Sequence, residues 1–215
     1  MPLGSRTKYV QETMNLRSLR KILWSLMGLA AVAGAGLVVW SEYTGEPATN
    51  SEAPAFRAEF QLTDHDGRTR TEKDFEGRWM LVFFGFANCP DVCPTTLSEV
   101  AAVMEQLGED AQKTVQPLFI SIDPERDTPS VLADFVPRLD AGIIGLTGTA
   151  EQIARTAQAF HIYYEKIEQR DAPDGYTMGH SSQLFLFDPS GDYAASWSYG
   201  TPAEQIAADL RERFR

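Results

Sequence analysis

An uninterrupted apolar segment stands near the amino terminus, at residues 22–40. It reads ILWSLMGLAAVAGAGLVVW, nineteen residues that carry no charge and in which only Ser25 is polar. As a helix it would be ~28 Å long, close to the hydrocarbon thickness of a bilayer. We therefore predict one transmembrane anchor here; the alternative is a cleaved signal peptide with Ala33-Gly34-Ala35 at its cleavage site.

The charges around this segment predict its orientation. Arg17, Arg20 and Lys21 precede it, and acidic residues follow it. Because positive residues are retained on the cytoplasmic side, residues 1–21 are predicted to be a cytoplasmic amino terminus. The larger part of the chain then lies across the membrane, on the periplasmic side of a bacterial inner membrane or on the intermembrane-space side in a mitochondrion.

Residues 41–54 differ in composition from what precedes and follows them. The stretch GEPATNSEAP is small, polar and proline-containing, which is typical of a linker. The remaining residues, 55–215, are predicted to form one domain.

Strand patterns alternate with helix patterns along this domain. Strands are expected at 56–62, 79–86, 115–122, 143–146, 162–167, 183–187 and 193–199, and helices after Pro94, near 130–139, at 150–160 and after Pro202. The near-continuous apolar run WMLVFFGF at 79–86 is typical of a central strand covered on both faces, and Asp66-Gly67 predicts a hairpin turn. Alternating strands and helices with a late hairpin predict an α/β domain with a mixed central sheet.

The net charge narrows the choice of partners. The formal value is −11, and residues 1–40 hold five Lys or Arg against one Glu, so the rest of the chain carries −15. An acidic domain has no electrostatic reason to hold a phosphate backbone, which argues against nucleic acid as a partner. The acidic surface either serves solubility or suits a basic partner.

Two cysteines, Cys89 and Cys93, carry the most distinctive chemistry. They lie in NCPDVCP, where the expected central strand passes into a helix. A disulfide between them would close too small a loop to stabilise the fold much, so the pair is interpreted as chemical rather than structural. If the segment is helical, the two side chains share one face, and the amino end of a helix favours the thiolate that both nucleophilic attack and metal binding need.

The spacing separates several chemistries. Thioredoxin-like oxidoreductases usually have two residues between the cysteines, whereas three are present here. A structural zinc site needs four Cys or His ligands, and the histidines do not repeat the cysteine spacing. Two buried, inert thiols are the plain alternative.

Three histidines are candidates for a third ligand. His65 falls in the predicted hairpin turn and is expected to be a solvated turn residue. His161 lies at a helix–strand junction, where a packed or surface role is expected. His180, in YTMGHSSQLFLFDPSG, follows a polar loop and precedes a strong strand, from which it could reach the cysteines. Two soft thiolates and an imidazole suit copper, either Cu(I) or Cu(II).

Three segments in this order, FGFANCPDVCPTTL, SIDPERDTP and GHSSQLFLFDPSG, resemble the Sco/SenC proteins of cytochrome c oxidase assembly. The resemblance covers roughly residues 55–215 and extends to the anchor. It implies a thioredoxin-like fold that binds one copper through Cys89, Cys93 and His180, the last on a mobile loop. Many members have an aspartate before the histidine where this chain has Gly179, which puts a supporting hydrogen bond in question but not the ligand. For Asp123 in DPERDT, capping the next turn is the preferred interpretation.

The resemblance also implies a function. Members help to mature the dinuclear copper centre of cytochrome c oxidase, so the oxidase copper-site subunit is the expected partner, with another copper chaperone as a possible donor. The first hypothesis is a copper metallochaperone that turns nothing over. The second is a thiol–disulfide oxidoreductase that uses Cys89 and Cys93 to reduce the subunit's cysteines. A peroxide-reducing relative ranks last, because no separate basic residue accompanies the cysteines.

Overall fold

The computed structural model describes Met27 and residues 56–108, 113–139 and 141–215. The chain divides into two units, Met1–Ser51 and Glu52–Arg215, and every described strand lies in the second. The predicted cytoplasmic segment, anchor and linker fall outside the described residues, apart from Met27. Among the residues that are described, no helix has both the length and the apolar character that a membrane crossing needs.

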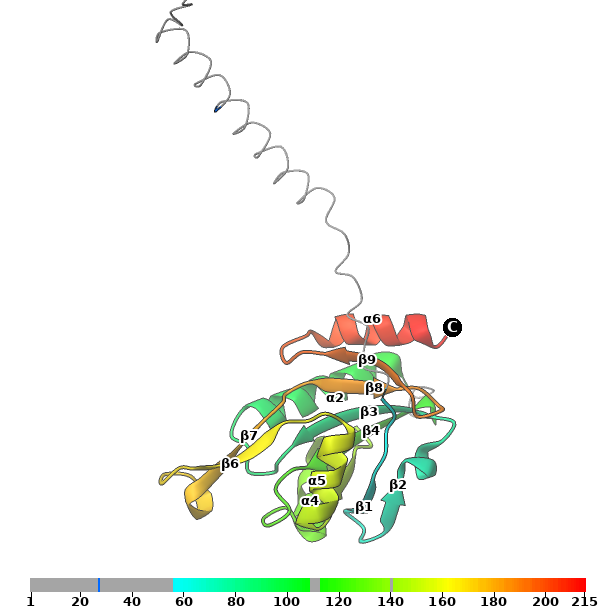
Figure 1. Ribbon diagram of the computed structural model, residues 1–215. Helices are drawn as coiled ribbons and strands as arrows, with labels where there is room; N and C mark the ends of the chain where they lie inside the picture. The colour runs from blue at the N-terminus through cyan, green and yellow to red at the C-terminus, as the bar shows by residue number, and fades with distance from the viewer. Residues whose placement is uncertain (1–26, 28–55, 109–112, 140) are drawn as a thin grey trace, which may run out of the picture. The chain divides into compact units, whose positions relative to one another are not determined.

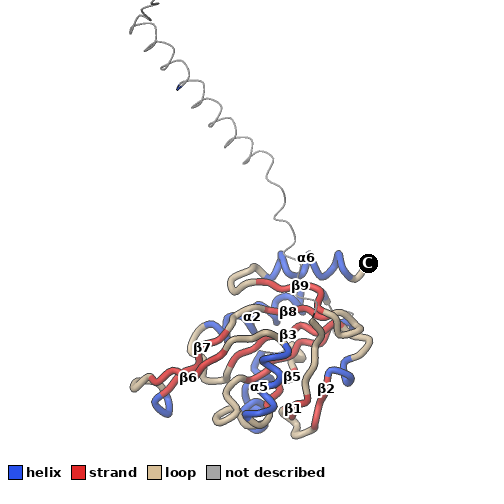
Figure 2. Tube along the Cα trace, viewed as in Figure 1, coloured by secondary structure: helices blue, strands red, loops and turns tan. Residues whose placement is uncertain are grey.

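Seven strands form one mixed sheet (Figures 1 and 2). In spatial order they are β2 (Thr69–Thr71), β1 (Gln61–Asp64), β5 (Ile144–Thr147), β4 (Val115–Ser121), β3 (Trp79–Gly85), β8 (Leu184–Phe187) and β9 (Tyr193–Trp197). The central strands β5, β4 and β3 run parallel, and the outer strands pair antiparallel with their neighbours. The predicted α/β class and mixed sheet are confirmed.

Helices cover both faces of this sheet. They are α2 (Val92–Leu107), α4 (Pro129–Phe135), α5 (Ala150–Ala159) and α6 (Ala203–Arg213), with short 3-10 helices η1 (Glu72–Phe75), η2 (Val136–Leu139) and η3 (Pro173–Gly175). Helix α2 contacts α6 and η2. Figures 1 and 2 show α5 in front of the sheet and α2 behind it. Both layers bury apolar side chains against β3 and β4, which makes these strands the centre of the core.

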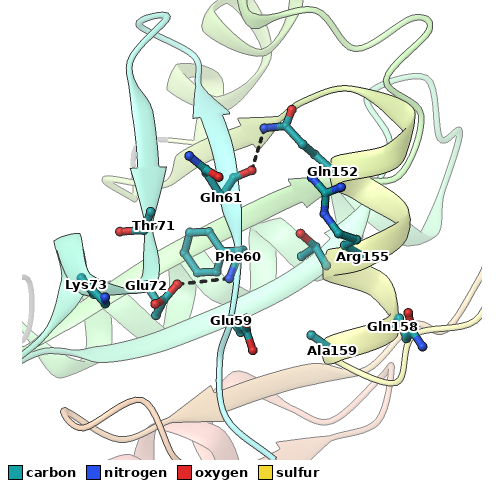
Figure 3. Close-up of a pocket in the computed structure, with 11 residues that line it drawn as sticks. Glu59, Phe60, Gln61, Thr71, Glu72, Lys73, Gln152, Arg155, Gln158 and Ala159 are labelled. Atoms are coloured by element: carbon teal, nitrogen blue, oxygen red, sulfur yellow. Dashed lines mark hydrogen bonds between the residues drawn. The ribbon is translucent and has the colours of Figure 1, made fainter.

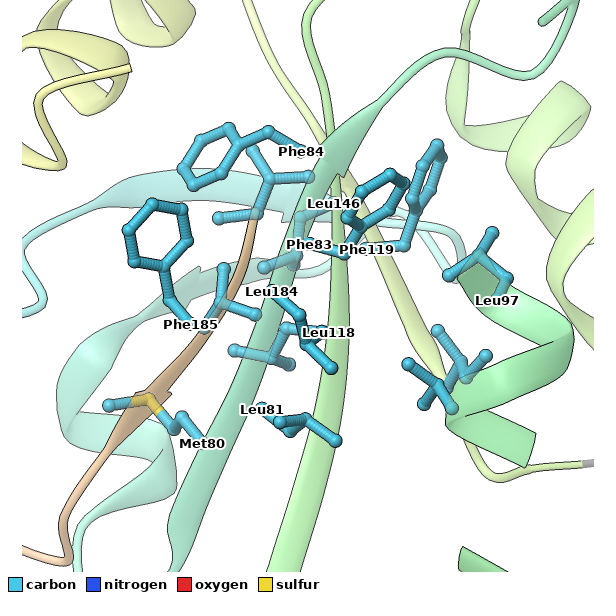
Figure 4. Packing of buried hydrophobic residues seen from close by; sticks show 14 of the residues in the cluster. Met80, Leu81, Phe83, Phe84, Leu97, Leu118, Phe119, Leu146, Leu184 and Phe185 are labelled. Atoms are coloured by element: carbon cyan, nitrogen blue, oxygen red, sulfur yellow. The ribbon is translucent and has the colours of Figure 1, made fainter. Parts of the chain in front are cut away.

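Strand β3 is apolar throughout because alternate side chains enter opposite layers. Phe83 stacks on Phe119 of β4 with ring centroids 6.4 Å apart, whereas Phe84 meets Phe160 at the end of α5 at 5.1 Å. All four rings are buried, and Figure 4 shows how this packing surrounds the two central strands. The carboxyl end of β3, where the cysteine segment begins, therefore rests on a rigid core.

Two predicted boundaries are wrong, and both errors have a structural reason. The strand expected from residue 56 begins only at Gln61, because the preceding residues bond to the β8–β9 turn: the Ala58 N–H donates to the Gly191 carbonyl. The polar loop expected through residues 171–175 is present, but it ends there: His180, expected on a loop, instead ends strand β7 (Tyr176–His180), which pairs with β6 (Tyr164–Glu168) in a separate antiparallel ribbon. Pairing with β6, rather than a hydrophobic pattern of its own, makes this segment a strand.

Candidate functional site

The cysteine segment joins the end of β3 to the first turn of α2. Cys89 precedes the helix and is half-buried, whereas Cys93 lies in the first turn and is completely buried. Both are free thiols. The expectation of a shared helical face is therefore corrected: Cys89 lies outside the helix, and its sulfur accepts a hydrogen bond from the Cys93 N–H at 3.4 Å. The sulfur thus caps the helix in place of Asp91, whose side chain makes no capping bond.

This geometry favours the thiolate at Cys89. The Cys93 thiol donates to the Cys89 sulfur, and the backbone N–H groups of Cys93 and Asp91 point at it; these hydrogen bonds lower the pKa of Cys89 to about 4 despite its partial burial. Donation to Cys89 and burial both raise the pKa of the Cys93 thiol far above its usual range. The pair therefore holds one thiolate and one thiol at neutral pH.

Cys93 fits into the core because β3 ends in a glycine. A Cβ atom at Gly85 would lie 2.8 Å from the Cys93 sulfur and 3.0 Å from the Phe119 ring. The distance to the sulfur is shorter than real Cβ contacts, so the space for the sulfur depends on this glycine.

His180 ends β7 and faces the cysteine pair. Its Nε2 lies 3.7 Å from the Cys93 sulfur, and its Nδ1 lies 2.8 Å from the Ser181 carbonyl oxygen. A proton on Nδ1, donated to that carbonyl, leaves the Nε2 lone pair towards the sulfur. The ring edge packs against Phe83 and Phe86, with centroids 6.1 and 6.0 Å away. The supporting hydrogen bond questioned at Gly179 is thus made by the backbone of Ser181.

The structure thus brings the three predicted ligands together from two sides. Two donors bound to one metal ion at about 2.1 and 2.3 Å would lie roughly 3.5–4 Å apart, and the 3.7 Å between the Cys93 sulfur and His180 Nε2 falls in this range. As the side chains stand, no group of three or more His, Cys, Asp or Glu residues in the described part of the chain is arranged to hold a metal ion. The donor set of two sulfurs and one imidazole fits a soft metal ion once these side chains adjust.

A buried acid, Asp127, lies beneath the cysteine segment and was not predicted from the sequence. Asp127 is completely buried, and its Oδ2 accepts from the Ala87 N–H at 2.9 Å and from the Ser121 hydroxyl at 2.6 Å. Burial raises its pKa, against the lowering effect of these two hydrogen bonds. Its position four residues after Asp123, in a segment already singled out, was the available signal. Asp127 ties the start of the cysteine loop to the end of β4.

Asp123 corrects another expectation. The turn that follows it is closed by its backbone carbonyl, which accepts from the N–H groups of Arg126 and Asp127. Its side chain is buried and bonds instead to Arg126 Nε and to the Tyr176 hydroxyl. The carboxylate therefore does not cap the turn, but joins this loop to the β6–β7 ribbon.

The other two histidines take part in the fold elsewhere. His65 lies in the β1–β2 hairpin, as predicted, but its Nδ1 accepts from the Gly145 N–H at 3.1 Å rather than only facing solvent. His161 follows α5 and packs edge-on against Phe56, with centroids 5.3 Å apart. A packed or surface role was expected for His161, and the structure agrees: the residue is exposed and touches Phe56.

The groove drawn in Figure 3 lies away from this chemistry. It runs between β1, η1 and α5, where Gln152 bonds to the Gln61 carbonyl and Glu72 accepts from the Phe60 N–H. Neither the cysteines nor His180 line it. Its mixed charges offer no set of groups converging on a ligand, so the candidate site remains the surface at the end of β3.

Fold and site together define a class of protein. A parallel sheet centre with antiparallel edges, and a cysteine pair where the central strand enters a helix, make this a thioredoxin-like domain with a nearby histidine. A family model described as SCO1/SenC matches residues 48–215. The chain belongs to the SCO1/SenC family.

Individual relatives agree with this assignment. The mitochondrial SCO2 homologue of Bos taurus is 37% identical over 201 residues, 91% of this chain and 75% of the relative. The mitochondrial SCO1 homologue of Homo sapiens is 35% identical over 75% of this chain, which spans 54% of the human protein. Among solved structures, copper-bound ScoI of Arabidopsis thaliana matches with a TM-score of 0.70 and 33% identity, covering 75% of this chain and 99% of its own. Copper-bound ScoI of Bradyrhizobium japonicum matches with a TM-score of 0.67 and 37% identity, and the match covers 74% of this chain and 99% of that structure.

Proposed function

We propose that this chain is a membrane-anchored copper metallochaperone that binds one copper ion through Cys89, Cys93 and His180. The observation that carries the proposal is the convergence of the three side chains, with His180 Nε2 3.7 Å from the Cys93 sulfur. The relatives solved with copper bound support copper as the ion. This donor set suits both Cu(I) and Cu(II).

The proposed binding sequence follows from the unequal thiols. Cys89 is the accessible thiolate and meets copper first. Cys93 then gives up its proton to solvent, because binding to the metal ion stabilises the Cys93 thiolate by more than the hydrogen bond to Cys89 stabilised the Cys93 thiol. His180 supplies Nε2, and the Ser181 carbonyl holds the ring in the tautomer that leaves this nitrogen free. Three ligands leave copper open to a partner's sulfur, through which it is passed on by ligand exchange.

The proposed recipient is the copper-site subunit of cytochrome c oxidase, whose dinuclear centre the chain would help to mature. The SCO1/SenC assignment supports this role, and the predicted anchor at 22–40 would hold the domain at the membrane surface. The domain would then face the periplasm, or the mitochondrial intermembrane space as the names of the mitochondrial relatives suggest. Another copper chaperone is the proposed donor.

A copper titration of the full chain, kept in detergent and reduced without oxygen, tests the proposal. We expect one copper per chain, sulfur-to-copper charge-transfer absorption with Cu(II), and a loss of at least ten-fold in affinity for Cys89→Ala, Cys93→Ala and His180→Ala. His161→Ala is the matched control and should bind as the wild type does. Copper bound no better than by the variant that lacks both cysteines would overturn the proposal.

One observation favours the second function, thiol–disulfide exchange. A half-exposed thiolate next to a buried thiol is the arrangement of an attacking and a resolving cysteine. Cys89 would attack a partner disulfide and release one partner thiolate; Cys93 would then displace the second, which leaves the partner reduced and a Cys89–Cys93 disulfide. His180 discriminates between the functions, because exchange with a model disulfide should survive His180→Ala whereas copper retention should not.

A further inference from the structure

The histidine half of the site is carried by a strand that does not belong to the main sheet. Strands β6 and β7 pair only with each other among the described strands. At the base of the ribbon, the Ser181 N–H donates to the Tyr163 carbonyl, and the Tyr163 N–H donates to the Ser181 hydroxyl. Neither bond connects the ribbon to the cysteine segment, and after His180 the chain joins the main sheet only at Leu184 of β8.

Arg126 makes that connection from the loop after β4. Its side chain is only 9% exposed, and its Nη1 donates to the carbonyls of Pro173 and Tyr176 at 3.0 and 3.1 Å. The guanidinium carbon lies 3.8 Å from the centroid of the Tyr176 ring and 5.8 Å from that of Phe86. One buried cation thus holds both the start of β7 and the aromatic ring that borders the cysteine loop.

Asp123 fixes Arg126 and Tyr176 to each other. One carboxylate oxygen binds Arg126 Nε and the other accepts from the Tyr176 hydroxyl at 2.9 Å. The Asp123 side chain is buried, and the backbone N–H of Asp123 donates to the hydroxyl oxygen of Ser121 at the end of β4. Burial and the bond to Asp123 raise the pKa of Tyr176 to about 12, so its hydroxyl remains a donor at neutral pH. The three side chains form a closed cluster anchored on the core.

The cluster restricts the position of His180 through strand β7. Tyr176 and His180 are four residues apart on one strand, so their side chains share a face, with roughly 13 Å between their Cα atoms. Phe86, under the guanidinium, packs edge-on against the His180 ring at 6.0 Å. Holding Tyr176 and Phe86 therefore holds both the strand that carries His180 and the surface on which its ring rests.

We propose that Arg126, with Asp123 and Tyr176, is a positioning clamp that keeps His180 within reach of the cysteine pair. The inference rests on the proposed function, since it concerns the third ligand of that site. The clamp residues themselves do not bind copper. They set how completely the ribbon is ordered, and therefore how much of the time the imidazole is available as a ligand.

Hydrogen exchange in the metal-free full chain tests the ordering. We expect Arg126→Met to speed amide exchange at least ten-fold in the ribbon, residues 164–180, and to leave β3 and β4 unchanged. Tyr176→Phe, which removes only the hydroxyl, should give a smaller change in the same direction and serves if Arg126→Met folds poorly. Lys166→Met is the matched control, because Lys166 also lies over the Tyr176 ring, at 3.9 Å, but is half-exposed. Unchanged ribbon exchange in both clamp variants would overturn the proposal.

A double-mutant cycle with Cu(II) ions tests the link to His180. Arg126→Met should weaken Cu(II) binding at least ten-fold in the wild-type chain and less than two-fold when His180 is already alanine. An equal loss in both backgrounds would show that Arg126 acts on the cysteines or the whole fold, and would sink the clamp. If His180→Ala alone left Cu(II) binding intact, the proposed ligand set would fail, whereas the exchange data would still decide whether the clamp orders the ribbon.

Discussion

The cysteine pair and His180 meet at one site but come from two parts of the molecule with different support. The cysteine segment rests on β3, whose side chains are buried on both faces, and Cys93 is itself part of that core. His180 ends a two-stranded ribbon in which β6 is largely exposed, with Ile167 and the preceding residue Tyr163 facing solvent. Two-stranded ribbons have little stability of their own, so the ribbon depends on what fastens it.

The difference indicates how such a site can bind a metal ion and still release it. A ligand pair fixed in the core keeps its geometry whether or not metal is present. A third ligand on a separately fastened ribbon can move away without unfolding the domain, because its local stability is set by a few contacts. Under the proposed function, release to a partner would require the ribbon to open, not the core.

The largest expected effect is on the free energy of unfolding, which should fall much more for a substitution in the core than for one in the ribbon. Phe119 is completely buried between Phe83 and Phe135, so Phe119→Ala should lower the free energy of unfolding by about 3–5 kcal/mol. Ile167 on the ribbon is 41% exposed, and Ile167→Ala should cost less than about 1 kcal/mol. Urea denaturation of both variants gives the comparison, and similar losses at the two positions would contradict the separation.

The buried part of the site was predicted from the sequence more fully than the ribbon. The run at 79–86 and the apolar spacing after Pro94 gave the central strand and α2, because burial on both faces leaves a continuous apolar pattern. The strand expected at 162–167 is present as β6, but its partner β7 left no such pattern, because Gly179 and His180 do not continue an alternation of apolar and polar residues. Strand β7 forms because β6 pairs with it, and the residues of β7 alone do not indicate this pairing.

A second prediction concerns how tightly the core holds Cys93. In Gly85→Ala the new Cβ would lie 2.8 Å from the Cys93 sulfur, so we expect a loss of about 1–3 kcal/mol in stability together with weaker copper binding. Gly145→Ala is the matched control, since its Cβ meets Val136 at 3.0 Å, away from the sulfurs. It should lose comparable stability without losing copper. Equal copper affinities in the two variants would mean that the sulfur has room to move.

The site was predictable as a set of residues but not as a geometry. The cysteine spacing and the three matching segments pointed to Cys89, Cys93 and His180, and the structure places these side chains together. The spacing could not show that Cys89 lies outside the helix and caps it, because i and i+4 share a face only when both are helical. Asp127, Asp123 and Arg126 act through contacts with segments 40 to 53 residues distant, which no local motif encodes.

The third prediction distinguishes the two cysteines by their reactivity. With a pKa of about 4, Cys89 is thiolate throughout the neutral range, so its alkylation by iodoacetamide should be nearly constant from pH 8 to pH 6. The rate should fall only as the pH drops through about 4, where the sulfur becomes protonated. A free thiol loses reactivity about ten-fold per pH unit below ~8.5, which makes it the reference. Mass spectrometry should find Cys89 modified before Cys93; a titration near pH 8.5 would contradict the proposed hydrogen bonds.

The smallest expected effect concerns the exposed ion pair between the ribbon and the loop after β4. Lys166 pairs with Glu125 at 2.6 Å, but the two side chains are 48% and 67% exposed, so solvent screens the attraction. Glu125→Gln should change stability and ribbon exchange by little, less than about 0.5 kcal/mol, and less still at high salt. Glu125 stands next to Arg126 in the same loop, so the two positions test whether burial or charge holds the ribbon. If Glu125→Gln had an effect as large as that of Arg126→Met, the surface ion pair, and not the buried guanidinium, would be what holds the ribbon.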